Sequence, residues 1–282
     1  MSNKIVAYDG LNARDLANIS AESSLKTSID IRDHETGKII FKGLKNKVII
    51  AGSGLLAKDL FDLPSTHTEV TPTYNTKLGC LNVEGELNTD VSPSATAKYP
   101  KILLFCIGTD GCGESSSQVY PVDYTKWISN PIPFRYPIKE NDISDDLRNT
   151  YFGRVESTDK NHYAYYFKRF EGEPKIVQQY TDGTLITKDS NIYESSKTVP
   201  AETYVEITLK ITKEDLREYF IATSNIDNAK FNSISLCYAY PVIGKDGYTY
   251  FNDIRPMTKL NIPNEPMIDI TKGIDIIYHI YM

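Results

Sequence analysis

From Phe152 onward, the chain is a series of segments with strand character and a single helix signal among them. β-Branched and aromatic residues alternate with polar ones in these segments, and turns such as TDG (181–183) separate them. The expected strands lie in FGRVES (152–157), HYAYYFKRFEG (162–172), KIVQQY (175–180), GTLITKD (183–189), AETYVEITLKI (201–211), KFNSISLCYAYPV (230–242), GYTYFNDIRPMTKLNI (247–262) and GIDIIYHIYM (273–282). Strands that follow one another without crossover helices pair antiparallel. The sequence therefore predicts a mainly β fold, α+β by content, with an antiparallel β-sandwich-like core, two or three short helices, and long loops or arms.

Three further segments predict extended structure in the first half of the chain. The stretch SLKTSIDIRDHETGKIIFKG (24–43) predicts a hairpin, because Ile29 and Ile31 alternate with polar residues before the turn HETGK. The uninterrupted apolar run KILLFCIG (101–108) is typical of a strand that is buried on both faces. NPIPFRYP (130–137) is expected to be extended, since residues before proline avoid the α region.

Three segments predict short helices. They are DYTKWI (123–128), ISDDLRNTYF (143–152) and KEDLREYF (213–220). In the last of these, Thr212 is placed to cap the helix, and Glu214 and Asp215 in its first turn suit the helix dipole.

The composition along the chain predicts one large domain with an arm. Residues 1–27 are mixed and polar, and we expect them to form an N-terminal arm that orders on a partner. Residues 28–282 form a single β-rich domain in this interpretation. Within it, the run of Ser, Thr, Asn and Pro from 64 to 100 is too long for a simple connector, and we interpret it as a long extended loop or insertion.

The stretch KVIIAGSGLLAKDL (47–60) is a near match to a dinucleotide-binding fingerprint. Gly52 and Gly54 stand in the first two glycine positions, and Ala57 replaces the third glycine. The fingerprint also needs a second parallel strand that ends in an acidic residue roughly twenty positions later. Glu69 lies near that distance but follows no strand. We therefore interpret the stretch as a strand that turns sharply into a surface helix, and we expect no cofactor.

Composition and charge exclude several classes of partner. The chain has 40% hydrophobic and 24% charged residues, which is ordinary for a soluble globular protein. Its net charge of -6 does not indicate a basic surface for phosphate groups, so we expect no direct nucleic-acid binding. No run approaches about 18 apolar residues, and we find no signal-peptide pattern, so we expect no membrane partner. The four cysteines, Cys80, Cys106, Cys112 and Cys237, are scattered, and we expect reduced, mostly buried thiols.

The residues that could carry chemistry form no recognisable catalytic or metal-binding pattern. The four histidines are His34, His67, His162 and His279, and none has the spacing of a nucleophile or metal motif. Asp110 and Glu114 flank Cys112 in a glycine-rich loop, where carboxylates could bind calcium, but the spacing is not that of a calcium loop. The carboxylate pairs in ENDISDD and KEDLRE are more typical of turns and caps than of a glycosidase. We therefore predict no catalytic residues, no cofactor-binding residues and no metal ligands, and hence no enzyme.

Five short segments, taken in order, resemble virion structural proteins of tailed bacteriophages. They are NKVIIAGSGLL (46–56), CIGTDGCG (106–113), FNSISLCYAY (231–240), IRPMTKLNIPNE (254–265) and IDIIYHIYM (274–282). The third departs from that class in having Ser233 and Ser235 where an acidic residue is common, and GTDGCG replaces a shorter GTG in the second. Residues 114–225 match nothing in the class.

The resemblance implies a non-enzymatic subunit of a phage tail, baseplate or neck. Such a protein is made in the host bacterial cytoplasm, is localised in the virion, and has as partners itself, in a homo-oligomeric ring, and other virion proteins. A content of 20 tyrosines against one tryptophan suits strands and protein contacts. Two alternatives remain open: a receptor- or glycan-binding β-sandwich of a tail fibre or adhesin, and a hydrolase. The loop from Asp110 to Glu114 could still bind an ion.

Overall fold

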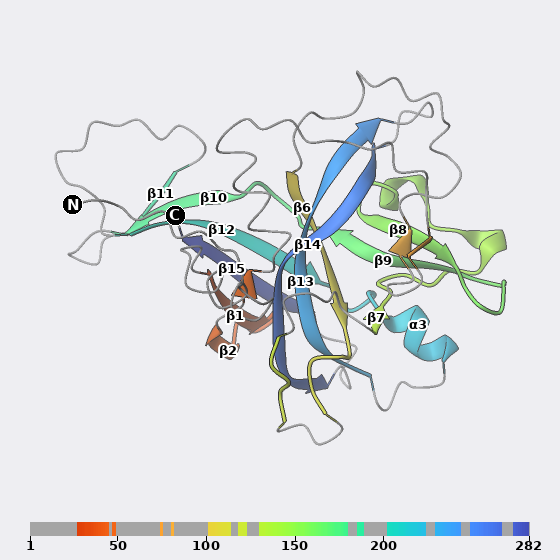
Figure 1. Ribbon diagram of the computed structural model, residues 1–282, viewed down its shortest axis with the longest axis horizontal. Coiled ribbons are helices and arrows are strands. Elements are labelled where there is room, and N and C mark those ends of the chain that lie inside the picture. The colour runs from red at the N-terminus through yellow and green to blue at the C-terminus, as the bar shows by residue number, and fades with distance from the viewer. Residues whose placement is uncertain are drawn as a thin grey trace, which may run out of the picture.

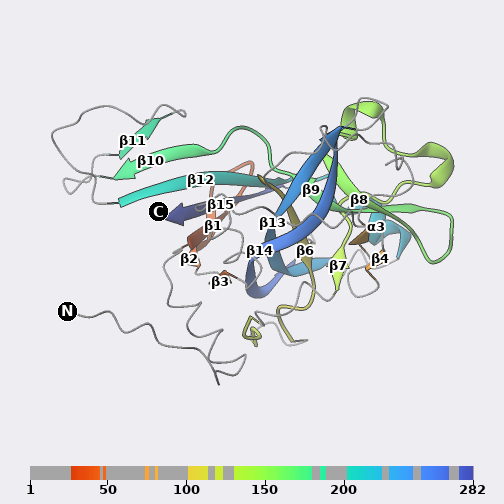
Figure 2. The same ribbon diagram turned by 45° about the horizontal axis from the view of Figure 1, so that its top comes forward.

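The protein is folded mainly into two antiparallel sheets. The computed structural model describes residues 27–44, 47–48, 74–75, 80–81, 101–113, 118–122, 130–179, 185–188, 202–223, 229–243, 249–266 and 273–281. The strands of one sheet run across those of the other (Figures 1 and 2). The expected mainly β fold, with an antiparallel sandwich-like core and few short helices, is confirmed.

The first sheet has six strands. Their order is β11 (Leu185–Lys188), β10 (Lys175–Gln179), β12 (Glu202–Ile211), β15 (Ile274–Tyr281), β1 (Thr27–Asp33) and β2 (Ile39–Leu44). Burial alternates strictly along β15, so that every second side chain from Ile274 to Ile280 is buried. This alternation follows from the pleat, which directs successive side chains to opposite faces. The predicted hairpin of β1 and β2 is confirmed.

The second sheet is built around the long strands of the chain. Its order is β3 (Lys47–Val48), β14 (Thr249–Pro266), β13 (Lys230–Ile243), β6 (Lys101–Gly108), β9 (Tyr163–Arg169) and β8 (Tyr151–Glu156), and β7 (Pro131–Ile132) also pairs with β6. β3 pairs antiparallel with β14. A dinucleotide fingerprint has its first strand in a parallel sheet, and the pairing of β3 differs from that arrangement.

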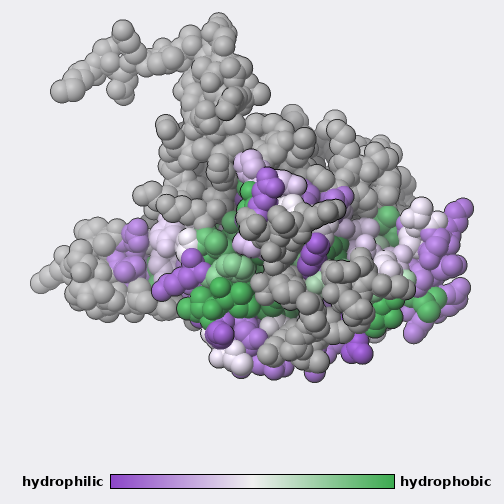
Figure 3. Space-filling view, turned by 90° about the horizontal axis from the view of Figure 1, so that it is seen from below, coloured by the Kyte–Doolittle hydropathy of each residue, from purple (hydrophilic) through white to green (hydrophobic). Residues whose placement is uncertain are grey.

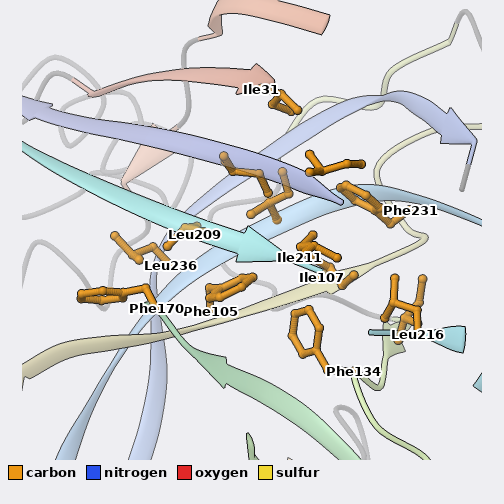
Figure 4. Close-up of a cluster of buried hydrophobic side chains, with 14 of the residues drawn as sticks. Ile31, Phe105, Ile107, Phe134, Phe170, Leu209, Ile211, Leu216, Phe231 and Leu236 are labelled. Carbon is orange, nitrogen blue, oxygen red and sulfur yellow. The ribbon is translucent and has the colours of Figure 1, made fainter. Parts of the chain in front are cut away.

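A hydrophobic core lies between the two sheets. Figure 4 shows Ile31, Leu209 and Ile211 of the first sheet facing Phe105, Ile107, Phe231 and Leu236 of the second. Phe134 joins this core from the 130–137 segment and makes an edge contact with Phe105, with ring centroids 5.1 Å apart. The predicted burial of β6 on both faces is confirmed for its second half, because Leu104 and Cys106 pack in a second buried cluster with Phe167.

One helix prediction is wrong in its boundaries. The helix α3 spans Arg217–Ala222 and begins after Leu216, whose φ of 68° is left-handed. Residues 213–216 form a turn, so Thr212 does not cap the helix and Glu214 and Asp215 do not lie in its first turn. The cause is the carboxylate of Asp215, which is bound in the protein interior as described below.

The two other short helices among the described residues are of 3-10 type. The predicted turn in 143–152 is confirmed as η3 (Asp145–Leu147), and η2 (Lys139–Asn141) precedes it. None of the helices in the described part of the chain has the length or the apolar run needed to cross a bilayer.

Several predictions lie outside the described residues. They are the N-terminal arm apart from Thr27, the helix after Gly54, the DYTKWI helix, and most of 64–100. Within that last stretch, β4 (Tyr74–Asn75) pairs antiparallel with β5 (Cys80–Leu81).

Candidate functional site

A deeply buried polar cluster joins the two sheets. Lys168 of β9 places its Nζ 2.7 Å from Asp215 Oδ2 and 2.8 Å from the backbone oxygen of Lys210 in β12. The two charged side chains are 1% and 0% exposed. The Tyr151 hydroxyl donates to Asp215 Oδ1 at 2.6 Å, and the Thr212 N–H donates to Oδ2 at 2.8 Å.

The environment of Tyr151 fixes its protonation state. Burial, and then the negative charge and hydrogen bond of Asp215, raise the pKa of the Tyr151 hydroxyl far above its usual range. The shift favours the protonated hydroxyl, which donates to the carboxylate. Each charge in the cluster has hydrogen-bonded partners and neither is open to solvent, so we interpret the cluster as a link between the sheets rather than a reaction centre. The only sequence signal was a lysine inside the apolar strand YAYYFKRF.

A row of three polar side chains crosses the outer face of the first sheet. Ser28 Oγ lies 3.3 Å from Nδ1 of His279, and Glu206 Oε2 lies 3.2 Å from its Nε2. The residues come from β1, β15 and β12, where each is directly opposite the next in register. The ring of Tyr204 lies 4.8 Å from the imidazole. The sequence placed His279 in no catalytic or metal motif, and its partners could be identified only from the strand register.

The row has the residue types of a Ser-His-Glu triad, but it lacks a second requirement of acyl transfer. A hydrolase needs backbone or side-chain donors aimed at a developing oxyanion. The backbone N–H groups around the row belong to the β12–β15–β1 ladders, and the three side chains stand on a regular sheet face rather than on a strained turn. Within the described residues the row is therefore a cross-strand hydrogen-bonded network.

An ion pair between Asp110 and Lys259 fixes the glycine-rich loop after β6 to β14. Asp110 Oδ2 lies 2.9 Å from Nζ of Lys259, and the Gly111 N–H donates to Asn232 Oδ1 at 2.7 Å. A Cβ on Gly111 would lie 2.0 Å from the backbone oxygen of Asn232, so glycine is required there. Because an ammonium group already faces the Asp110 carboxylate, the loop is a poor cation site.

The other candidates in and near this loop do not form a site in the described part of the chain. Glu114 lies outside the described residues, and Cys112 is buried. Cys106 and Cys237 are buried free thiols with their Sγ atoms 3.9 Å apart, which confirms the prediction for these three cysteines. Among the described residues, no group of three or more His, Cys, Asp or Glu could hold a metal ion.

Two of the other histidines, His34 and His162, take part in surface contacts. His34 Nδ1 lies 2.9 Å from Asp275, and His67 lies outside the described residues. His162 stacks on Tyr136 with ring centroids 4.6 Å apart and an interplanar angle of 12°. Tyr136 also contacts Tyr219 of α3 edge-on, at 5.5 Å.

This aromatic contact fixes α3 against the 130–137 segment. The Tyr136 N–H donates to Glu218 Oε2 at 2.8 Å, and Arg135 pairs with Glu218 Oε1 at 3.2 Å. Two residues beyond each tyrosine, Ile138 and Ile221 are 54% and 53% exposed. Exposed apolar side chains mark a protein contact surface where they form a contiguous patch.

The chain matches no protein-family model, no curated protein and no solved structure. The resemblance to phage virion proteins therefore remains a prediction.

Proposed function

We propose that this chain is a non-enzymatic structural subunit of a tailed-bacteriophage virion, located in the tail, baseplate or neck. It acts through contacts with copies of itself in a ring and with other virion proteins. The proposal rests on the collinear segments that resemble this class and on the surface of the described residues.

One observation carries the assembly role. The described surface exposes isoleucines in two separate places: Ile39 and Ile40 on β2, which are 43% and 36% exposed, and Ile138 and Ile221 near α3. Viewed from below, hydrophobic residues show at the surface left of the centre and again toward the right (Figure 3). Two separate apolar patches on one chain suit a subunit that contacts more than one neighbour.

Negative-stain electron microscopy of the purified full-length chain tests the proposal. We expect closed rings for the wild type and dispersed single particles for Ile39→Asp/Ile40→Asp, because a buried carboxylate at a contact is unfavourable. Val119→Asp is the control, since Val119 is also exposed but lies in the loop after β6. Dispersed single particles for the wild type at every concentration would overturn the proposal.

A further inference from the structure

The strand β2 presents a basic, aliphatic surface, which we call the lysine surface. It consists of Lys38, Ile39, Ile40 and Lys42, all of them exposed. From 38 to 47 the sequence KIIFKGLKNK holds four lysines and no acidic residue. Of the acidic residues in the same hairpin, Asp30 accepts the Gly43 N–H at 2.8 Å, Asp33 accepts the Thr36 N–H at 2.7 Å, and Glu35 lies exposed at the turn.

The register of β2 argues against the addition of another strand to its free edge. β2 is the last strand in the order of the first sheet. Its pairing with β1 shifts twice, between Ile29 and Ile31 and again between Ile31 and Arg32. Bulges and lysines are the means by which native sheets block edge pairing. A partner of β2 therefore binds through its side chains.

A second surface has the opposite charge, and we call it the acidic surface. It consists of Ile138, Glu140, Asp145 and Asp146, all exposed, in the turns that hold η2 and η3. The carboxylate of Asp145 is 77% exposed even though Arg148 lies 3.5 Å away. An exposed isoleucine thus stands beside acidic groups here, as isoleucines stand beside lysines on β2.

The two surfaces lie apart along the long axis of the molecule. Both ribbon views place β2 left of the centre and the turns after β7 on the right (Figures 1 and 2). Either surface placed against its own copy would bring like charges together, which is unfavourable. Two separate surfaces of unlike charge favour a heterologous, head-to-tail contact, which closes into a ring when the rotation permits.

We propose that copies of this chain associate head to tail, with the lysine surface of one copy against the acidic surface of the next. This inference rests on the proposed assembly role and identifies the surfaces and the partner, a second copy of this chain.

Charge reversal on each surface tests the inference with the full-length protein. Lys38→Glu/Lys42→Glu and Glu140→Lys/Asp145→Lys/Asp146→Lys each place like charges across the contact. We expect each variant alone to dissociate, with a dissociation constant raised on the order of 100-fold in sedimentation velocity. Lys101→Glu/Lys175→Glu reverses two other exposed lysines and is the matched control, which should assemble as the wild type does.

Mixing the two reversed variants restores opposite charges at every contact. An equimolar mixture should therefore recover the wild-type sedimentation coefficient, and so should one chain that carries all five substitutions. Circular dichroism checks that each variant is folded. If the wild type assembles and both reversed variants assemble equally well, the surfaces are wrong while the assembly role stands; a monomeric wild type overturns both.

Discussion

The ammonium group of Lys168 lies 2.7 Å from the carboxylate of Asp215, and both side chains are buried between the two sheets. Lys168 belongs to the second sheet, and Asp215 follows β12 of the first. The pair fixes the two layers to each other at the end of the core near α3. Its hydrogen bonds also explain why the helix begins after Leu216 rather than at Thr212.

Removing one partner of this pair should destabilise the protein strongly. Lys168→Met leaves the Asp215 carboxylate buried without its counter-ion, and we expect the free energy of unfolding to fall by about 3–5 kcal/mol. The double variant Lys168→Met/Asp215→Leu leaves no uncompensated charge, so it should cost less than the sum of the two single substitutions. Urea denaturation measures each value.

A surface pair is the control for this cycle. Lys213 Nζ lies 3.9 Å from Glu214 Oε1 and both side chains are largely exposed, so Lys213→Ala should change stability by no more than about 0.5 kcal/mol. Strict additivity of Lys168→Met and Asp215→Leu would contradict the buried ion pair.

Alkaline pH should destabilise the fold through Tyr151. Burial, then Asp215, raises the pKa of its hydroxyl, so the fold favours the neutral form. This contribution is fully present below the pKa of an unfolded tyrosine, about 10, and is lost as pH rises beyond it. The free energy of unfolding from urea curves should therefore fall more steeply above that pH in the wild type than in Tyr151→Phe. Parallel pH dependence of the two proteins would show that Tyr151 ionises freely in the fold.

The strands were predictable and their long-range partners were not. Alternation in IDIIYHIY and the apolar run KILLFCIG indicated β15 and β6, because burial on one or both faces leaves a local pattern. KEDLREYF also carried correct local signals for a helix, but Asp215 is bound by Lys168, 47 residues earlier in the chain. Ser28 and His279 are 251 residues apart, and only strand register brings them together.

Gly153, the single glycine of the β8–β9 hairpin, should not tolerate a side chain. Its φ is 68°, and a Cβ there would lie 2.5 Å from Cδ2 of the buried Phe167 ring. Gly153→Ala should lower the free energy of unfolding by about 2–4 kcal/mol, from backbone strain plus overpacking. Gly172→Ala is the matched control: Gly172 has a φ of 79° with nothing within 4 Å, so only the backbone cost of about 1 kcal/mol remains. Thermal or urea unfolding measures both variants. If Gly153→Ala and Gly172→Ala lowered the free energy of unfolding equally, this would rule out the packing contribution of Phe167.

Removal of the polar group of Ser235 should stabilise the fold. Its hydroxyl is buried in β13 and has no hydrogen-bond partner among the described residues, so Ser235→Ala should raise the free energy of unfolding by about 0.5–1 kcal/mol. Thr258→Val is the contrasting variant, because the Thr258 hydroxyl bonds the Tyr278 hydroxyl across the core; it should cost about 1–2 kcal/mol. A loss of stability in Ser235→Ala would reveal an ordered water or another partner at this hydroxyl.

Sedimentation equilibrium of the wild-type chain tests the assembly role most directly. The account predicts a mass that is a whole-number multiple of the 31.8 kDa chain and that falls toward a single chain as salt screens the lysine and acidic surfaces. A mass of one chain at every protein concentration and every salt concentration would contradict it.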